Sequence, residues 1–338
     1  SCVISIVKRK LFLLNFVSTL KEKKLIMKGP LFYSKILLFG EYGIIKDSKG
    51  LSIPYNYYNG ALKITAEPTE EAVKSNESLR AFATHLKQMQ AENPELVSFD
   101  MQALERDIEN GMYFDSSIPQ GYGVGSSGAL VAAIYDQYAN KKVTVLENLT
   151  REKLLQLKAI FGKMESFFHG TSSGLDPLNS YLSLPILINS KDNVEPTGIP
   201  SQKEEGIGGV FLIDSEMVGE TAPMVSIFMD NLKNEGFRSM MKSQFTKYTD
   251  AAVENFLKGD FKTLFGNTKE LSKIALSHFK PMIPEKFHGV WQQGIESNDY
   301  YLKLCGSGGG GYILGFAPDF EKAKEALKDY KLELVYKF

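Results

Sequence analysis

Residues 119–129 read PQGYGVGSSGA, a glycine loop that runs directly into a segment with apolar residues at helical spacing. Apolar side chains recur three and four positions apart between residues 130 and 138, which predicts a helix over 126–138 with Ser126 or Ser127 as its N-cap. Free N–H groups and the helix dipole at such a start attract an anion. The segment therefore predicts a phosphate-binding loop, with an ordinary glycine-rich turn as the alternative.

This loop lacks both of the common nucleotide-binding signatures. A Walker A loop would continue as Gly-Lys-Ser/Thr, and the dinucleotide fingerprint needs a third glycine where Ser126 stands. A later run, CGSGGGGY at residues 305–312, does match G-x-G-x-x-G, but an apolar, strand-like segment follows it where a helix is required. We expect two paired strands, 301–305 and 312–316, around a glycine turn that lines a site, with a purely structural hairpin as the alternative.

A third segment, ESFFHGTSSGLD at residues 165–176, ends in a carboxylate after a glycine-containing turn. Asp176, held on a loop beside a phosphate site, can take a proton from an attacking hydroxyl, and Glu165, near the end of the preceding helix, can hold Mg²⁺. The alternative for both is a helix cap or a surface carboxylate. Residues 170–174 also match the G-x-S-x-G elbow of serine hydrolases with Ser172 as the nucleophile, but that elbow follows a strand and here a helix precedes it. Together, the three segments predict ATP-dependent phosphoryl transfer to a small molecule.

Composition excludes several other classes of protein. The 338 residues carry a net charge of -1, without the clustered basic face that nucleic-acid binding requires. Cys2 and Cys305 lie far apart, which argues against a disulfide framework and a cysteine zinc site, and the four histidines show no metal-ligand spacing. We expect a cytoplasmic protein that acts on a small molecule and binds neither nucleic acid nor membrane; a homodimer is compatible with the sequence.

Residues 1–26 differ from the rest of the chain. The apolar run LFLLNFV at residues 11–17 follows lysines, as in a signal peptide, but Asn15 interrupts it and no small-x-small cleavage site follows. The run is also too short to span a membrane. We expect these residues to be a leader or extension outside the fold, with Met27 as a plausible start.

The remaining pattern predicts a two-domain chain. We expect strands over 33–42, 61–66, 97–103 and 112–115, and helices over 79–89 and 154–168. Residues 189–209 are rich in polar residues, glycine and proline and predict a linker. Residues 222–298 are expected to be mostly helical. The predicted division is an N-terminal domain over 27–195 and a C-terminal domain over 196–338.

Taken in this order, the three segments resemble the GHMP kinases over about residues 30–338. The loop at 119–129 is similar to the family's nucleotide loop, and residues 165–176 are similar to the mevalonate kinase version of its second motif, with the same spacing between the two acids. KILLFGE at residues 35–41 and FLIDS at residues 211–215 also resemble segments of that branch. The resemblance implies an α+β fold of two domains, the first similar to domain 2 of ribosomal protein S5 and the second ferredoxin-like.

The resemblance also implies roles for individual residues. Asp176 would be the general base on the acceptor hydroxyl, and Lys35 would lie near that hydroxyl and the γ-phosphate of ATP. Ser127 and Glu165 would bind Mg²⁺. The nucleotide would be held by Pro119, Gly121, Gly123, Val124, Gly125, Ser126, Ser127, Gly128, Gly308 and Gly309, and the acceptor would meet Glu41, Tyr42 and Thr221.

The sequence departs from the family pattern at three places, of which the first and last lie on the acceptor side and bear on the acceptor more than on the reaction. Tyr42 stands where mevalonate kinases usually have His, Gly128 stands in place of Ala, and the loop over 216–221 lacks the Arg often found before its Thr. Mevalonate is the acceptor that the resemblance favours. Another GHMP kinase acting on phosphomevalonate or a sugar, a diphosphomevalonate decarboxylase and a non-catalytic ATP-binding sensor remain alternatives.

Overall fold

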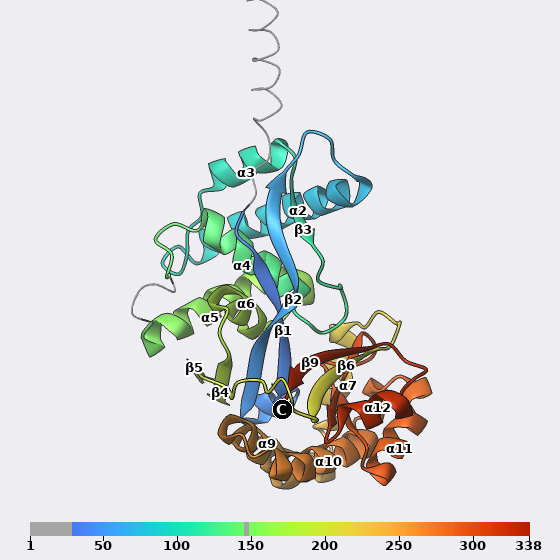
Figure 1. The fold of residues 1–338 in the computed structure, drawn as a ribbon. Helices are drawn as coiled ribbons and strands as arrows, with labels where there is room; N and C mark the ends of the chain where they lie inside the picture. Colours follow the sequence, from blue (N-terminus) through green and yellow to red (C-terminus); the bar gives the residue numbers. More distant parts are fainter. Residues whose placement is uncertain (1–28, 145–148) are drawn as a thin grey trace, which may run out of the picture.

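The computed structural model describes residues 29–144 and 149–338, which form two lobes of mixed helix and sheet (Figure 1). We call residues 29–196 the N-terminal lobe and residues 209–338 the C-terminal lobe. The predicted leader over residues 1–26 lies outside the described residues. The α+β class is confirmed.

The N-terminal lobe is built on a five-stranded antiparallel sheet whose central strand is long. That strand, β2 (Gly50–Ile64), pairs with β1 (Phe32–Phe39) along its length, with β3 (Met112–Ser116) at its end and with β4 (Ile186–Ser190) at its start. A short β5 (Asn193–Pro196) completes the sheet. Only the last part of β2 was predicted, because Pro54 and the polar residues after it break the alternating pattern.

Helices cover this sheet in chain order: α2 (Glu70–Glu92), α3 (Met101–Glu109), α4 (Ser126–Tyr138), α5 (Arg151–His169) and α6 (Leu175–Leu182). The apolar stripe predicted over 79–89 is the buried face of α2. The strand predicted over 97–103 is wrong: only Phe99 makes a bridge, to Ala139, and Asp100 caps α3 by accepting the N–H of Ala103 at 3.0 Å.

The C-terminal lobe has a four-stranded antiparallel sheet with the order β7-β8-β6-β9. Its strands are β6 (Gly209–Asp214), β7 (Tyr301–Leu304), β8 (Tyr312–Ala317) and β9 (Leu332–Lys337). The helices between β6 and β7 are α7 (Thr221–Asn231), α8 (Glu235–Met240), a π-helical turn (Met241–Phe245), α9 (Thr246–Lys258), α10 (Phe261–His278) and α11 (His288–Ser297), and α12 (Phe320–Ala326) lies between β8 and β9. The β-α-β-β-α-β order with this strand order is ferredoxin-like.

The two lobes pack against each other where β1 ends. The ring of Phe39, the last residue of β1, lies 5.3 Å from that of Phe316 and 6.5 Å from that of Phe256. Glu333 on β9 accepts hydrogen bonds from Tyr55 and Tyr58 of β2. Figure 1 shows β1 and β2 running from the helices of the N-terminal lobe toward α9 of the C-terminal lobe.

The predicted linker over 189–209 is shorter than expected. Its first part pairs as the β4–β5 hairpin, and the irregular segment runs only from 197 to 208. The domain division at residues 195–196 stays a prediction. In the described part of the chain, no helix has the length and apolar character that crossing a membrane requires.

Candidate active site

A cavity of about 1110 Å³ lies where the two lobes meet, and most of the predicted site residues line it. From the N-terminal lobe come Lys35, Glu41, Tyr42, Pro119, Gly121, Gly123, Gly125, Ser126, Ser127, Glu165 and Asp176; from the C-terminal lobe come Thr221 and Gly308. Three predicted residues do not line it. Val124 and Gly128 are buried behind the wall, and Gly309 packs on Met224.

The cavity has two ends, which lie at opposite ends of β1. One end is formed by β3 and the start of α2. This end lies near the beginning of β1, because β3 pairs with the last part of β2, which begins opposite the first residue of β1. The other end is formed by Glu41, Tyr42 and Ile45, which follow the end of β1. Lys35, in the middle of β1, lies between the two ends.

Lys35 and Asp176 form an ion pair in the wall of this cavity. Lys35 Nζ lies 2.9 Å from Asp176 Oδ1; the lysine side chain is 4% exposed and the carboxylate 41%. Burial lowers the pKa of Lys35, but the charge and hydrogen bond of Asp176, together with the charge of Glu165 and the thiol of Cys305, outweigh it, so the pKa is raised and the ammonium stays charged. Asp176 lies in the first turn of α6 and not, as predicted, on a loop. The pair places an accessible carboxylate beside a fixed positive charge.

The glycine loop is held directly over this pair. Lys35 N donates to the carbonyl of Val124 at 2.9 Å, so β1 and the loop are joined by backbone. Gly125, with φ 84°, is the N-cap residue of α4, and a Cβ there would come 3.1 Å from Lys35 Cγ. The predicted serine cap is wrong: α4 has no side-chain cap, because its N-cap residue is Gly125 and both serines lie inside the first turn, where the Ser127 hydroxyl bonds Glu165. The amides at this helix start are left free for an anion.

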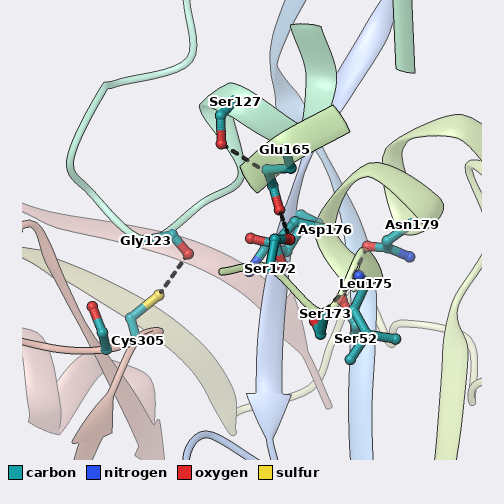
Figure 2. Close-up of polar contacts among 12 residues, drawn as sticks. Ser52, Gly123, Ser127, Glu165, Ser172, Ser173, Leu175, Asp176, Asn179 and Cys305 are labelled. Carbon is teal, nitrogen blue, oxygen red and sulfur yellow. Dashed lines mark hydrogen bonds and ion pairs between the residues drawn. The ribbon is translucent and has the colours of Figure 1, made fainter. Parts of the chain in front are cut away.

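Glu165, which is buried, is the centre of a polar cluster in the cavity wall (Figure 2). Its Oε2 accepts a hydrogen bond from Ser127 Oγ at 2.9 Å, and its Oε1 accepts one from Ser172 Oγ at 2.6 Å. His169 Nε2 lies 2.9 Å from Ser127 Oγ. Burial, with the nearby charge of Asp176, raises the pKa of Glu165 to about 7. A cation placed beside a carboxylate whose pKa is raised in this way stabilises its charged form.

The glycine run at residues 305–312 packs against the glycine loop at residues 119–129. A Cβ on Gly123, where φ is 77°, would come closer than 3.0 Å to the carbonyl oxygen of Cys305. Tyr312 N donates to Tyr122 O at 3.3 Å, and Gly219 N to Gly121 O at 2.9 Å. Burial raises the pKa of Cys305 to about 11, so its thiol is protonated at neutral pH and is no nucleophile.

The departure at Gly128 has a structural reason. A Cβ at this position would come 2.8 Å from the carbonyl carbon of Asp176, where α4 and α6 pack together. A glycine therefore lets the helix that starts at the phosphate loop approach the helix that carries Asp176.

The end of the cavity that is formed by Glu41 and Tyr42 contacts the C-terminal lobe through both of these side chains. Lys303 on β7 forms an ion pair with Glu41, and both side chains are buried. The Tyr42 hydroxyl donates to the Ser307 carbonyl at 2.5 Å, and its ring lies 4.7 Å from Phe228 and 5.6 Å from Phe279. Sequence reasoning missed Lys303, whose only signal is a charge between the apolar residues of a predicted strand.

Thr221 reaches this end of the cavity as well. It is the first residue of α7, and its Oγ1 accepts a hydrogen bond from Ser307 Oγ at 3.5 Å. The structure thus brings Tyr42 and Thr221 to Ser307, and Glu41 to the nearby Lys303, although residues 41–42, 221 and 303–307 are far apart in the sequence.

The donor set suits Mg²⁺ only with the help of a bound phosphate. Among residues 29–144 and 149–338, no group of three or more His, Cys, Asp and Glu side chains could hold a metal. Ser127 and Glu165 supply one hydroxyl and one carboxylate. That set fits Mg²⁺, which proteins usually hold through one or two side chains together with substrate phosphates.

Comparison with known proteins supports the fold. Residues 85–183 match the family model described as GHMP kinases N terminal domain, whereas no curated protein matches the chain. The structure is similar to that of L. major mevalonate kinase in complex with R-mevalonate, with a TM-score of 0.60 and 17% identity over 92% of this chain and 96% of that one.

Two other solved structures show the same fold. Streptococcus pneumoniae phosphomevalonate kinase, in complex with phosphomevalonate and AMPPNP, has a TM-score of 0.60 and 14% identity over 92% of this chain and 99% of that one. Lactococcus lactis galactokinase, complexed with galactose, has a TM-score of 0.59 and 11% identity over 95% and 98%. Residues 85–183 therefore match the GHMP kinase N-terminal domain, and the chain shares its fold with mevalonate kinase, phosphomevalonate kinase and galactokinase.

Proposed function

We propose that this protein transfers the γ-phosphoryl group of ATP to a hydroxyl of a small molecule. The observation that carries the proposal is the Lys35–Asp176 pair at 2.9 Å, which lies in the cavity wall beneath the free amides at the start of α4. A base, a fixed positive charge and an anion site within one cavity are what phosphoryl transfer requires.

In the proposed reaction, Asp176 accepts the proton of the acceptor hydroxyl as that oxygen attacks the γ-phosphorus. The bond from phosphorus to the bridging oxygen of ADP breaks, and ADP leaves with the electron pair. Lys35 stays protonated throughout and stabilises the negative charge that develops on the acceptor oxygen and the transferred group.

The amides of Gly123 to Ser127 would hold the triphosphate, since they lie at the positive end of the α4 dipole. Ser127 and Glu165 would hold Mg²⁺, which neutralises phosphate charge when it is bound. The end of the cavity formed by β3 and α2 is then left for the nucleoside, and the end formed by Glu41, Tyr42 and Thr221 for the acceptor.

We propose mevalonate as the acceptor, which would place the protein in isoprenoid precursor synthesis. Support comes from the motifs at residues 35–41 and 165–176 and from the likeness to the fold of mevalonate kinases. Tyr42 takes the place of the usual His, and its hydroxyl is already bonded to Ser307.

A coupled assay of ADP release tests the proposal. Purified protein with Mg²⁺-ATP is offered mevalonate, phosphomevalonate, galactose and homoserine in separate reactions. Turnover with mevalonate alone supports both the phosphoryl transfer and the choice of mevalonate as the acceptor. Turnover with another acceptor retains the mechanism and rejects mevalonate, and ATP binding without turnover on any acceptor contradicts the kinase assignment.

A further inference from the structure

We propose that Ser172 is a positioning residue that orients Glu165 for metal binding. Its Oγ donates to Glu165 Oε1 at 2.6 Å (Figure 2). The same Oγ accepts the N–H of Gly174 at 3.1 Å. With its oxygen held from one side, the hydroxyl has its single proton aimed at the carboxylate. The inference rests on the proposed function and adds a residue to its metal site.

The G-x-S-x-G match had singled out Ser172 for a different role. The imidazole that usually takes the proton of a serine nucleophile does not serve Ser172, because the nearby His169 contacts Ser127 and Ser172 donates to the Glu165 carboxylate. The segment that precedes Ser172 is helix α5, not a strand. The geometry therefore assigns Ser172 to Glu165 and not to acyl transfer.

The two oxygens of Glu165 are held by different serines from different elements. Ser127, at the start of α4, binds Oε2, and Ser172, in the turn after α5, binds Oε1. Glu165 itself is 4% exposed, so each of these bonds matters for a carboxylate that has little contact with solvent. With both bonds present the carboxylate is held in one orientation; without Ser172 only the Ser127 bond restrains its rotation about the last side-chain bond.

An oriented carboxylate matters because Ser127 and Glu165 are the two side chains assigned to Mg²⁺. Groups that orient a metal ligand typically change metal affinity by about 10- to 100-fold when they are removed. Ser172 bonds the Glu165 side chain, and its second bond is to the backbone of Gly174, so its loss should weaken the metal site while leaving the side chains of the base and the acceptor residues in place.

The neighbouring serine offers a matched control. Ser173 has the same side chain, is exposed, and makes only a 3.4 Å contact with the N–H of Leu175. The test compares Ser172→Ala, Ser173→Ala and the conservative variant Ser172→Thr, which keeps the hydroxyl. Thermal unfolding of each variant checks that the fold is retained.

The first readout is Mn²⁺ binding in the presence of ADP, followed by electron paramagnetic resonance. We expect Ser172→Ala to weaken Mn²⁺ binding about tenfold or more, Ser173→Ala to leave it unchanged and Ser172→Thr to restore most of it. Unchanged binding in Ser172→Ala, or an equal loss in Ser173→Ala, overturns the proposal.

The second readout is the steady-state kinetics of the proposed kinase reaction. In Ser172→Ala the Mg²⁺ concentration that gives half-maximal rate should rise, while the KM of the acceptor stays unchanged. If the wild-type protein binds Mn²⁺ and ADP but turns over no acceptor, the kinase assignment fails, and the Mn²⁺ comparison still decides the role of Ser172. If wild-type protein binds no Mn²⁺ with ADP, the role of Ser172 in a metal site is rejected.

Discussion

Lys303→Met should destabilise the protein strongly, because it leaves the Glu41 carboxylate buried without its partner. The two side chains are 2% and 6% exposed, and one oxygen of Glu41 already lacks a hydrogen-bond partner. Removing one member of such a pair typically costs about 3–5 kcal/mol. Total stabilities are typically about 5–15 kcal/mol, so the loss is a large share.

Urea unfolding of Lys303→Met and of the double variant Glu41→Leu/Lys303→Met measures this coupling. Replacing both charges by apolar groups removes the unpaired carboxylate, so the double variant should recover most of the lost free energy of unfolding. A loss below about 1 kcal/mol in the single variant, or an equal loss in both variants, would refute the reasoning.

The pH dependence gives an independent check. Burial raises the pKa of Glu41 above its ordinary value of 4.5, and Lys303 lowers it. Without Lys303 the pKa of Glu41 in the folded state rises further, so the folded protein binds a proton more tightly than the unfolded chain does. The free energy of unfolding of Lys303→Met should therefore increase, relative to wild type, as the pH falls from neutral toward that ordinary value.

Three further predictions concern the candidate site. Asp176→Asn should lower kcat by orders of magnitude with little change in ATP affinity, measured by steady-state kinetics and nucleotide titration; normal turnover would reject Asp176 as the base. Metal-free wild-type protein should lose stability as the pH rises from about 4.5 through about 7, because the folded state holds the Glu165 proton more tightly than the unfolded chain. In Glu165→Gln the free energy of unfolding should change less with pH over this range. Urea unfolding that shows the same pH dependence in both proteins would contradict the raised pKa. Gly128→Ala should cost about 1–3 kcal/mol and lower kcat, because its Cβ would push against the backbone of Asp176; a variant with wild-type stability and kcat would show that α4 and α6 have room to separate.

Local patterns predicted much of the fold. The stripe over 79–89 and the segment 126–138 are helices because their apolar residues follow the helical period, and strands β7 and β8 flank the glycine run as expected. The errors fall where a local pattern is ambiguous. Residues 97–103 look strand-like until Asp100 caps α3, and β2 is hidden by Pro54 and the polar residues beyond it.

The three glycine and acid segments were identified in the sequence, because glycines, hydroxyls and carboxylates in short motifs can be read without knowing what they contact. What the sequence could not provide was the partner of each side chain. Ser127 looked like a helix cap and instead bonds Glu165, and Ser172 looked like a misplaced nucleophile and bonds the same carboxylate. Lys303 gave almost no signal, since its meaning depends on Glu41, which is 262 residues away in the chain.

The sequence by itself therefore determined the elements and the type of chemistry, because helical period, strand alternation and the character of short motifs are local properties. The tertiary structure alone decided which charges are paired, which hydroxyls face a carboxylate and where a glycine is required for close approach. These depend on burial and on contacts between distant segments, and the free energy of a buried charge is set by the groups that surround it.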